Sequence, residues 1–541
     1  MIELRTISFG YDDGTVLDGI DLTVEDGELM LLAGPTGVGK STLLGVVAGL
    51  VPNYSGGTLR GDVLLDGESI IERPARERAH VIGYVGQNPA AWFVTDTVEE
   101  ELAYGMEQLG LPASTMRRRV EETLDLLGIA ELRHRDLRTL SGGQQQRVAI
   151  GAVLTCHPRL LVLDEPTSAL DPTAAEEVLA TITRLVHDLG VSVLIAEHRL
   201  ERVVPFADRM CLLQRDGSVL VGEPAEVLAE APIAPPIVEL GRIAGWSPLP
   251  LTVRDARRRS VELRRRLTPP AAFASSPTGE PSVVAQRLVV AHGRDVALRE
   301  VSMRLHPGRV TALMGRNGSG KSTLMWTLQG RLRRTSGTLA VAGADTHELK
   351  KDGRRERVGL VPQTAADLLY LETVAEECEA ADVSAGAATG AGGASEGAAG
   401  RCRALLESMA PGIDDAMHPR DLSEGQRLAL AVAIVLTAQP PVLLLDEPTR
   451  GLDYPAKAAL TRALRALAAD GHAVLVATHD VEFVAGVADD VVVLAEGEVV
   501  SDGPVREVVA ESPAFAPQVM KVLGPEWLQV REVADALAGS A

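Results

Sequence analysis

The stretch that decides the fold is GPTGVGKST, at Gly34–Thr42. Glycines at this spacing let the backbone curl until its N–H groups converge on phosphate oxygens, and a helix that follows adds positive potential at its N-terminus. The loop comes after the short apolar run Glu28–Ala33 and before Ser41–Leu50, which has helical composition. A buried strand, a glycine-rich loop and a helix in this order predict an α/β unit that binds a nucleotide phosphate.

The same stretch recurs further along the chain, together with three other motifs. Gly315–Thr323 reads GRNGSGKST. The paired motifs are LSGGQ and LSEGQ (Leu140–Gln144, Leu422–Gln426), LLVLDEPTSALD and VLLLDEPTRGLD (Leu160–Asp171, Val442–Asp453), and LIAEH and LVATH (Leu194–His198, Leu475–His479). The copies are offset by 281 or 282 residues throughout, so the chain is a duplicated unit rather than a series of different domains.

The repeat sets the expected domain boundaries. We expect a first domain at residues 1–230 and a second at 282–515, joined by a Pro- and Arg-rich linker at 231–281 and followed by a C-terminal tail at 516–541. The linker carries the basic run Arg254–Leu267. A solvated helix is the favoured interpretation of this run, and contact with anionic lipid head groups is the alternative.

Each copy is predicted to be an α/β domain with a parallel-sheet core, an antiparallel β subdomain and a helical insert. Leu160–Leu163 and Val191–Ala196 are short apolar runs of the kind found in buried parallel strands. Apolar residues fall at helical spacing between Gln87 and Ser141, which places the insert there. The Ala/Gly/Ser-rich segment Ala380–Gly400 is expected to be a disordered loop that lengthens the second insert.

Composition excludes several classes of function. The chain has 541 residues and a net charge of −21, which argues against a general nucleic-acid binder. Aromatic residues make up 3%, too few for a platform that stacks single strands. No apolar run reaches the ~18–20 residues of a membrane span, and MIELRTISFG has no basic-then-apolar signal region. Four scattered cysteines without a CxxC pair fit a reduced, cytosolic compartment.

Lysine is rare in this chain, and its positions are informative. There are six lysines, and Lys40 is the one lysine among the first 300 residues. Nearly every other basic position is arginine, so Lys40 and Lys321 mark sites where a compact ammonium is needed. We expect both to neutralise phosphate oxygens, with the next residues, Ser41 and Ser322, as ligands of Mg²⁺.

Acidic residues follow the second apolar strand of each copy. An Asp at the carboxyl end of a parallel strand beside a phosphate loop can hold Mg²⁺. Asp164 and Asp446 are therefore the candidate ligands of Mg²⁺. The adjacent carboxylates, Glu165 and Glu447, are expected to polarise the attacking water. His198 and His479 each end a further apolar strand. A lone histidine there is more often a structural cap, but matching positions in two nucleotide-binding units favour contact with the γ-phosphate.

The order of these motifs resembles that of the nucleotide-binding domain of ABC ATPases. The resemblance adds Gln87 and Gln363 as further metal-site residues and covers about 230 residues in each copy. It implies ATP and Mg²⁺ as ligands. It also implies a head-to-tail sandwich, in which each ATP lies between the phosphate loop of one domain and the LSGGQ motif of the other.

The resemblance assigns one composite site to each phosphate loop. The first would join Gly34, Pro35, Thr36, Gly37, Val38, Gly39, Lys40, Ser41 and Thr42 to Ser423, Glu424, Gly425 and Gln426. The second would join Gly315, Arg316, Asn317, Gly318, Ser319, Gly320, Lys321, Ser322 and Thr323 to Ser141, Gly142, Gly143 and Gln144. The serine and glycine of each LSGGQ-type motif would donate hydrogen bonds to the γ-phosphate.

Two departures from the family pattern make the halves unequal. Tyr11 stands where the family stacks an aromatic ring on adenine, and the second copy has His292 there, with less stacking area. Glu424 replaces the first glycine of the second LSGGQ-type motif; its carboxylate either repels the γ-phosphate or points to solvent. Because both Glu165 and Glu447 are present, we expect both sites to hydrolyse ATP.

The segment Gly86–Pro112 resembles the stretch after the same glutamine in energy-coupling factor importers. That resemblance implies an ATPase at the cytoplasmic face of the cell membrane, peripheral to it. Its partners would be a transmembrane coupling protein and a substrate-binding membrane subunit, importing a vitamin, a vitamin precursor or a transition-metal ion. The alternatives are a fused sugar-importer ATPase and a soluble ABC ATPase acting on ribosomes or DNA. A scaffold without turnover is disfavoured because both halves keep Glu and His.

Overall fold

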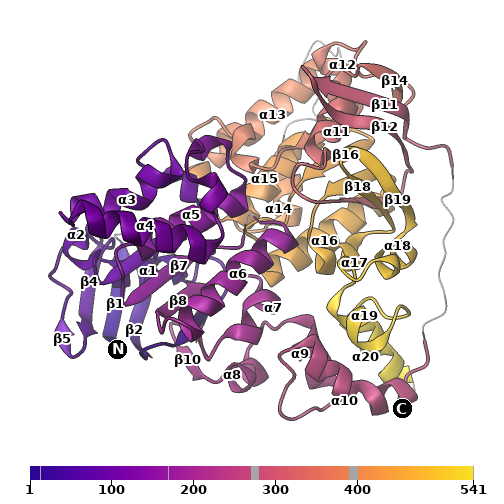
Figure 1. Ribbon diagram of the computed structural model, residues 1–541. Helices are drawn as coiled ribbons and strands as arrows, with labels where there is room; N and C mark the ends of the chain where they lie inside the picture. The colour runs from indigo at the N-terminus through magenta and orange to yellow at the C-terminus, as the bar shows by residue number, and fades with distance from the viewer. Residues whose placement is uncertain (12–13, 169, 270–278, 389–399, 540–541) are drawn as a thin grey trace. The chain divides into compact units, whose positions relative to one another are not determined.

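A computed structural model describes residues 1–11, 14–168, 170–269, 279–388 and 400–539 of the chain (Figure 1). These residues form two compact units, 1–256 and 257–541. Each unit has a parallel-sheet core, a separate antiparallel sheet and a set of helices, which confirms the predicted α/β class. No helix among the described residues has both the length and the apolar character needed to cross a bilayer.

The core of unit 1 is a six-stranded sheet in the order β10-β9-β3-β8-β7-β6. Its strands are β3 (Leu29–Ala33), β6 (Ile82–Val85), β7 (Leu160–Asp164), β8 (Ser192–Ala196), β9 (Arg209–Leu213) and β10 (Val219–Gly222). All neighbours pair in parallel except β10, which runs antiparallel to β9. Strands β3, β7 and β8 are buried along their whole length, which is why they appear in the sequence as unbroken apolar runs.

The antiparallel sheet of unit 1 has the order β2-β1-β4-β5. Its strands are β1 (Ile2–Tyr11), β2 (Gly14–Val24), β4 (Thr58–Leu65) and β5 (Glu68–Ser69). Ile2, Leu4, Ile7 and Phe9 of β1 are buried and join the same hydrophobic cluster as residues of β3 and of the helix after it. The sheet is therefore packed against the nucleotide-binding core on one face.

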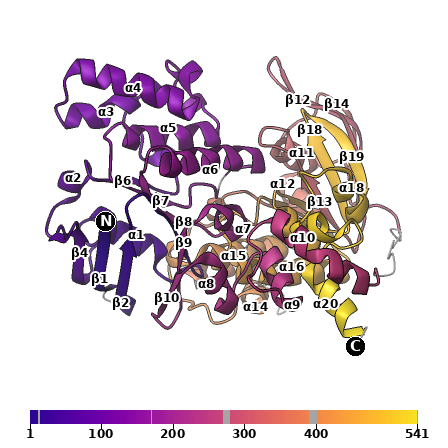
Figure 2. The ribbon, with the colours of Figure 1, turned by 60° about the horizontal axis from the view of Figure 1, so that its bottom comes forward.

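The helices of unit 1 include the predicted insert. They are α1 (Lys40–Ala48), α2 (Ala75–Arg78), α3 (Val98–Gln108), α4 (Ala113–Leu127), α5 (Gly142–Leu154), α6 (Pro172–His187), α7 (Leu200–Val203), α8 (Pro224–Glu230) and α9 (Pro236–Ile243). Leu102, Leu124 and Val148 share one buried cluster and so join α3, α4 and α5. Figure 2 shows these three helices together, away from the antiparallel strands β1, β2 and β4.

Unit 2 repeats this architecture. Its core sheet has the order β15-β16-β17-β13-β18-β19, and its antiparallel sheet the order β12-β11-β14. The strands are β11 (Val283–His292), β12 (Asp295–Leu305), β13 (Val310–Met314), β14 (Ser336–Val341), β15 (Val358–Val361), β16 (Val442–Asp446), β17 (Ala473–Ala477), β18 (Asp490–Ala495) and β19 (Glu498–Pro504). The helices are α11 (Lys321–Leu328), α12 (Lys351–Arg355), α13 (Val374–Ala388), α14 (Arg401–Met409), α15 (Glu424–Leu436), α16 (Tyr454–Ala469), α17 (Val481–Val487), α18 (Val505–Glu511), α19 (Gln518–Leu523) and α20 (Val530–Gly539).

Two segments outside the repeated motifs turn out to be helical. The basic run of the linker forms α10 (Val253–Arg266), as expected, although one of its sides is buried. The expectation of a disordered loop from Ala380 was wrong for its first part, because α13 continues to Ala388. Alanine is the best helix former, so an Ala-rich stretch extends a helix that has already begun. Residues 389–399 lie outside the described residues.

Candidate active site

The phosphate loop of unit 1 connects β3 to α1 and has the conformation that its glycines allow. Gly34, Gly37 and Gly39 have φ values of 150°, 79° and 102°. A Cβ atom at Gly34 would lie 2.7 Å from the carbonyl oxygen of Leu213, so no larger residue fits there. Lys40 begins α1, and its Nζ donates to the carbonyl oxygens of Gly34 and Pro35 at 2.8 and 3.1 Å. The loop therefore closes around a buried ammonium group.

The phosphate loop of unit 2 has the same backbone between β13 and α11. Gly315, Gly318 and Gly320 have φ values of 148°, 80° and 102°. Lys321 Nζ donates to the carbonyl oxygens of Gly315 and Arg316 at 2.8 and 3.1 Å. Both loops thus form the cradle that the sequence predicts.

A buried aspartate ends the neighbouring strand in each unit. Asp164 is the last residue of β7, and Asp446 the last of β16. Burial raises the pKa of both carboxyl groups, and hydrogen bonds with Ser41 and Ser322 partly offset this. The Oδ1 atom of each aspartate is buried and has no hydrogen-bond partner within the described part of the chain.

These groups fit Mg²⁺, which prefers hard oxygen ligands and one or two carboxylates beside a phosphate. Asp164 with Ser41, and Asp446 with Ser322, would hold the ion in the two units. When bound, Mg²⁺ neutralises negative charge on the phosphates. The partnerless oxygen of each aspartate is the observation that supports this assignment, since buried acceptors are normally satisfied.

The two predicted catalytic glutamates occupy strained positions directly after these strands. Glu165 and Glu447 have φ values of 50° and 48°, a left-handed conformation that L-residues other than glycine rarely adopt. Each is held by a backbone hydrogen bond, from Glu165 N to Ala196 O at 2.9 Å and from Glu447 N to Ala477 O at 2.8 Å. The neighbouring strand thus fixes the backbone from which each glutamate side chain extends.

Glu165 is positioned by two side chains. Gln87 Nε2 donates to its Oε2 atom at 3.0 Å, and His198 Nε2 lies 2.7 Å from its Oε1 atom. The structure therefore brings His198 to the glutamate. It also places Gln87, predicted as a metal-site residue, against the same carboxylate.

The corresponding cluster of unit 2 has different members. His479 Nδ1 lies 2.9 Å from Glu447 Oε2, and Lys321 Nζ lies 3.9 Å from Glu447 Oε1. Gln363 is exposed, and its side chain makes no hydrogen bond to another described residue. In the first half a glutamine and a histidine contact the glutamate, whereas in the second half a histidine and Lys321 lie beside it.

A further acidic residue, Glu197, lies beneath the first cluster and was missed by the sequence analysis. It is 1% exposed, and its Oε1 atom accepts from the backbone N–H and the hydroxyl of Thr167 at 2.8 and 2.6 Å. Burial raises the pKa of this carboxyl group, and the charge of Glu165 raises it further. The second copy has Thr478 at this position, hydrogen-bonded to Thr449 at 3.1 Å. In the sequence, Glu197 could have been recognised from the difference between LIAEH and LVATH, where the second copy has Thr478.

Each LSGGQ-type motif begins a helix through a capping box. Ser141 caps α5, with Gln144 N donating to its Oγ at 3.4 Å and Gln144 Oε1 accepting from Ser141 N at 3.0 Å. Ser423 and Gln426 repeat this arrangement at α15, with distances of 3.3 and 3.0 Å. The glutamine side chains therefore stabilise the helix starts. Each serine hydroxyl accepts one hydrogen bond and still has its own proton to donate.

Glu424, the departure in the second motif, pairs with an arginine one turn later. Its Oε1 atom accepts from Arg427 Nη1. Arg427 is fixed in turn by the carbonyl oxygens of Pro419, Arg420 and Leu422. The ion pair offsets part of the charge of this carboxylate, and the Glu424 side chain is about half exposed to solvent.

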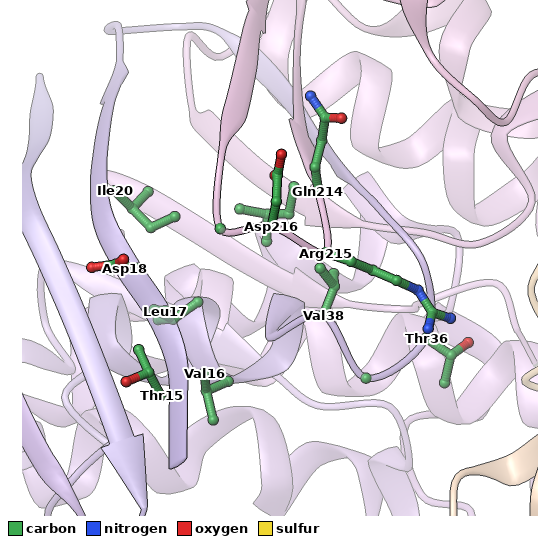
Figure 3. A pocket seen from close by; sticks show the side chains of 13 residues that line it. Thr15, Val16, Leu17, Asp18, Ile20, Thr36, Val38, Gln214, Arg215 and Asp216 are labelled. Carbon is green, nitrogen blue, oxygen red and sulfur yellow. The ribbon is translucent and has the colours of Figure 1, made fainter. Parts of the chain in front are cut away.

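The predicted adenine contacts occupy equivalent places in the two antiparallel sheets. Tyr11 pairs with Gly14 at the end of the β1–β2 hairpin, and His292 pairs with Asp295 at the end of β11–β12. Tyr11 is 42% exposed, and its ring meets that of Phe9 edge-on at 4.8 Å. A cavity of about 480 Å³ opens nearby, between β2, the tip of the phosphate loop and the turn after β9. Figure 3 shows Arg215 of that turn extending toward Thr36 of the loop.

Together these groups can cleave a phosphoanhydride bond. The loop N–H groups and Lys40 would bind and orient the phosphates, and charge neutralisation of this kind is the main catalytic device in phosphoryl transfer. Glu165 can accept the proton of an attacking water, while Gln87 and His198 fix its carboxylate. Fold and site thus define a P-loop ATPase with two nucleotide sites.

Comparison with known proteins identifies the family. The sequence model of the ABC transporter family matches residues 17–168 and 298–450. A protein of Streptomyces avermitilis named "Putative ABC transporter ATP-binding protein" is 57% identical over 99% of this chain and 100% of its own length. One of the same name from Methanosarcina mazei is 34% identical over 93% of this chain and 88% of its own length. The chain belongs to the ABC transporter ATP-binding family and is an ATPase with two tandem domains.

A solved structure supports the fold alone. The structure described as ribosome-bound archaeal Pelota and ABCE1 matches with a TM-score of 0.62 and 22% sequence identity, covering 95% of this chain and 82% of that chain.

Proposed function

We propose that this chain is the ATP-hydrolysing subunit of an energy-coupling factor type importer for a vitamin, a vitamin precursor or a transition-metal ion. Its partners would be a transmembrane coupling protein and a substrate-binding membrane subunit. The chain would act at the cytoplasmic face of the membrane. The proposal rests on the segment after Gln87 and on what that segment exposes.

The observation that carries the proposal is a pair of exposed apolar patches, one after each glutamine. In unit 1, Trp92 and Val94 are 56% and 62% exposed, directly before α3. In unit 2, Tyr370 and Leu371 are 81% and 37% exposed, directly before α13. Large apolar side chains exposed at equivalent places suggest a surface for a protein partner, and buried aromatic residues dominate the energy of such contacts.

The patch in unit 1 is linked to the catalytic cluster. The Trp92 ring meets that of Tyr84 at 5.9 Å, and Tyr84 forms a side-chain hydrogen bond with Asp164. Gln87, which donates to Glu165, lies in the same loop. A helix of the coupling protein seated on Trp92 would therefore be able to shift the residues that position Glu165.

We propose further that the two domains pair head to tail around ATP. The free hydroxyl proton of Ser141 would be donated to the nucleotide bound at Lys321, and that of Ser423 to the nucleotide bound at Lys40. ATP would then favour the paired state, and hydrolysis would release it, because the ligand binds the two states with different affinity.

A fused sugar-importer ATPase remains the alternative within transport, and a soluble ATPase acting on ribosomes or DNA the alternative outside it. The exposed side chains of Trp92 and Val94 favour a protein partner. The net charge of −21 disfavours direct binding to nucleic acid.

Purification in mild detergent tests the proposal. The tagged chain should copurify with multi-span membrane proteins, and the double variant Trp92→Ala/Val94→Ser should lose them. Tyr54→Ala is a matched control, because Tyr54 is 79% exposed in unit 1 but is far along the chain from Gln87. Recovery of ribosomes in high salt, with no integral membrane protein, would overturn the import proposal.

A further inference from the structure

Helix α10 has a charge opposite to that of the chain as a whole. Residues Val253–Leu267 contain seven arginines and two acidic residues, a net charge of +5, in a chain with a net charge of −21. A block of positively charged residues on a protein with a negative net charge creates a local potential that attracts negatively charged partners. Neither the ATPase site nor the proposed partner patches use these arginines.

The inner side of α10 is fixed. Its buried residues are Ala256, Ser260, Leu263 and Leu267. Arg257 Nε and Arg264 Nη2 donate to the carbonyl oxygens of Lys521 and Val522, in the last turn of α19. These two arginines therefore anchor the helix to unit 2, and their positive charges meet the negative end of α19.

The outer side of α10 is a row of exposed residues. Arg254, Arg258, Val261 and Arg265 are separated by four, three and four positions, which places them along one helical face. Arg254 and Arg258 form no ion pair with any described residue, and Val261 is 55% exposed. Arg265 lies 3.5 Å from Glu262, but both side chains are more than 70% exposed, so the pair is weak.

We infer that this outer face of α10 binds an anionic lipid surface. Three arginines supply attraction to phosphate head groups, and Val261 in the middle of the row can enter the apolar boundary beneath them. A Debye length of about 8 Å limits repulsion from the acidic remainder of the chain. The choice of a lipid surface over another polyanion rests on the proposed function, which brings the chain to a membrane. An RNA ligand would be expected to use aromatic side chains, and the row has none.

Sedimentation of the full chain with lipid vesicles tests this inference without any partner protein. The chain should bind vesicles that contain phosphatidylglycerol and should not bind vesicles of phosphatidylcholine alone, and its binding should fall as salt is added. The triple variant Arg254→Gln/Arg258→Gln/Arg265→Gln should bind about 100-fold more weakly, from the usual contribution of each arginine near an anionic surface.

A matched control variant tests whether vesicle binding depends on this face of α10 or only on the net charge of the chain. Arg117→Gln/Arg118→Gln/Arg531→Gln removes the same charge from other exposed positions and should bind as the parent does. The emission of a tryptophan introduced by Val261→Trp should shift to shorter wavelength on vesicle binding. Equal binding by parent and triple variant, or an unshifted emission, would overturn the inference.

Two further outcomes are informative. Tighter binding to a labelled poly(U) oligonucleotide than to phosphatidylglycerol vesicles, lost in the same triple variant, would assign α10 to nucleic acid and overturn the lipid inference. A chain that binds these vesicles but captures no membrane protein from detergent would support the role of α10 while overturning the proposed transport function.

Discussion

At the scale of single residues, Glu165 and Glu447 are the proposed water-polarising groups. Glu165→Gln and Glu447→Gln should each keep ATP binding, because neither residue belongs to a phosphate loop. The double variant should lower kcat by about 10²–10⁴-fold, the usual contribution of general-base assistance. Phosphate release and binding of a fluorescent ATP analogue measure the two properties separately. Full turnover in the double variant would refute the assignment.

The buried carboxyl group of Glu197 makes the stability of unit 1 depend on pH. Burial raises the pKa of its carboxyl group above the ordinary 4.5, so the folded chain holds this proton more tightly than the unfolded chain. The contribution of Glu197 to stability is therefore most favourable at low pH and is lost as pH rises through the raised pKa.

Glu197→Gln should remove that dependence. At neutral pH we expect the variant to be more stable than the parent by about 1–3 kcal/mol, the usual desolvation cost of a buried polar group, and this gain should shrink as pH falls toward 4.5. Urea unfolding followed by circular dichroism at several pH values measures it. Glu176→Gln, at an exposed position on α6, should show no such trend; a variant that is less stable than the parent at neutral pH would contradict the account.

At the scale of elements, helix α15 begins with Glu424 in place of a glycine, and an arginine one turn later pairs with it. The Arg427 guanidinium neutralises Glu424 at the helix start, where positive potential favours a phosphate. Arg427→Gln should leave an unpaired carboxylate there and raise the KM for ATP at the proposed site of Lys40 by roughly 5–30-fold, equivalent to about 1–2 kcal/mol. Turnover in the Glu447→Gln background reports on that site alone.

A second substitution tests whether Arg427 acts through its charge or by holding the local backbone. In the same background, adding Glu424→Gly to Arg427→Gln should restore the KM, because the repelling group is gone. Failure of the second change to restore it would mean that Arg427 acts by holding the carbonyl groups of Pro419, Arg420 and Leu422, and not by charge.

Elements with strong local signals were predictable from the sequence. The strand before Gly34 and the helix after it follow from apolar runs and glycine spacing, and α3 and α4 follow from helical periodicity. Helices α9, α19 and α20 were not predicted, since they are short and occur in segments marked by proline or without a repeated motif. The end of α13 was misjudged because low complexity was given more weight than the helix propensity of alanine.

Contacts between side chains were less predictable than the side chains themselves. The sequence identified Gln87, Glu165 and His198 separately, but not that the glutamine and the histidine both contact the glutamate. Such convergence depends on which strands are neighbours in the sheet, and β7 and β8 are 28 residues apart along the chain. By contrast, the pairing of Glu424 with Arg427 was predictable from their spacing of three residues on a helix.

At the scale of the whole molecule, duplication has produced two units of the same architecture with different chemistry at matching positions. Unit 1 has Tyr11, Gln87 bonded to Glu165, and a buried carboxylate below the histidine. Unit 2 has His292, an exposed Gln363 and Thr478. The differences include the residues around each glutamate and the predicted adenine contact, and Glu424 also stands where the first copy has Gly142. The phosphate cradles, in contrast, are nearly identical in backbone conformation. The two halves therefore share the geometry of the phosphate loop, and any inequality between the sites arises in the residues around it.

The left-handed backbone at Glu165 and Glu447 also has a consequence for substitutions at these two positions. Each glutamate adopts a conformation that costs an ordinary residue about 1–2 kcal/mol and glycine or asparagine less. Replacing either glutamate by glycine or asparagine would therefore relieve backbone strain, but it would also remove the carboxylate that is expected to polarise water. Backbone strain and the proposed chemistry thus act in opposite directions at these two positions.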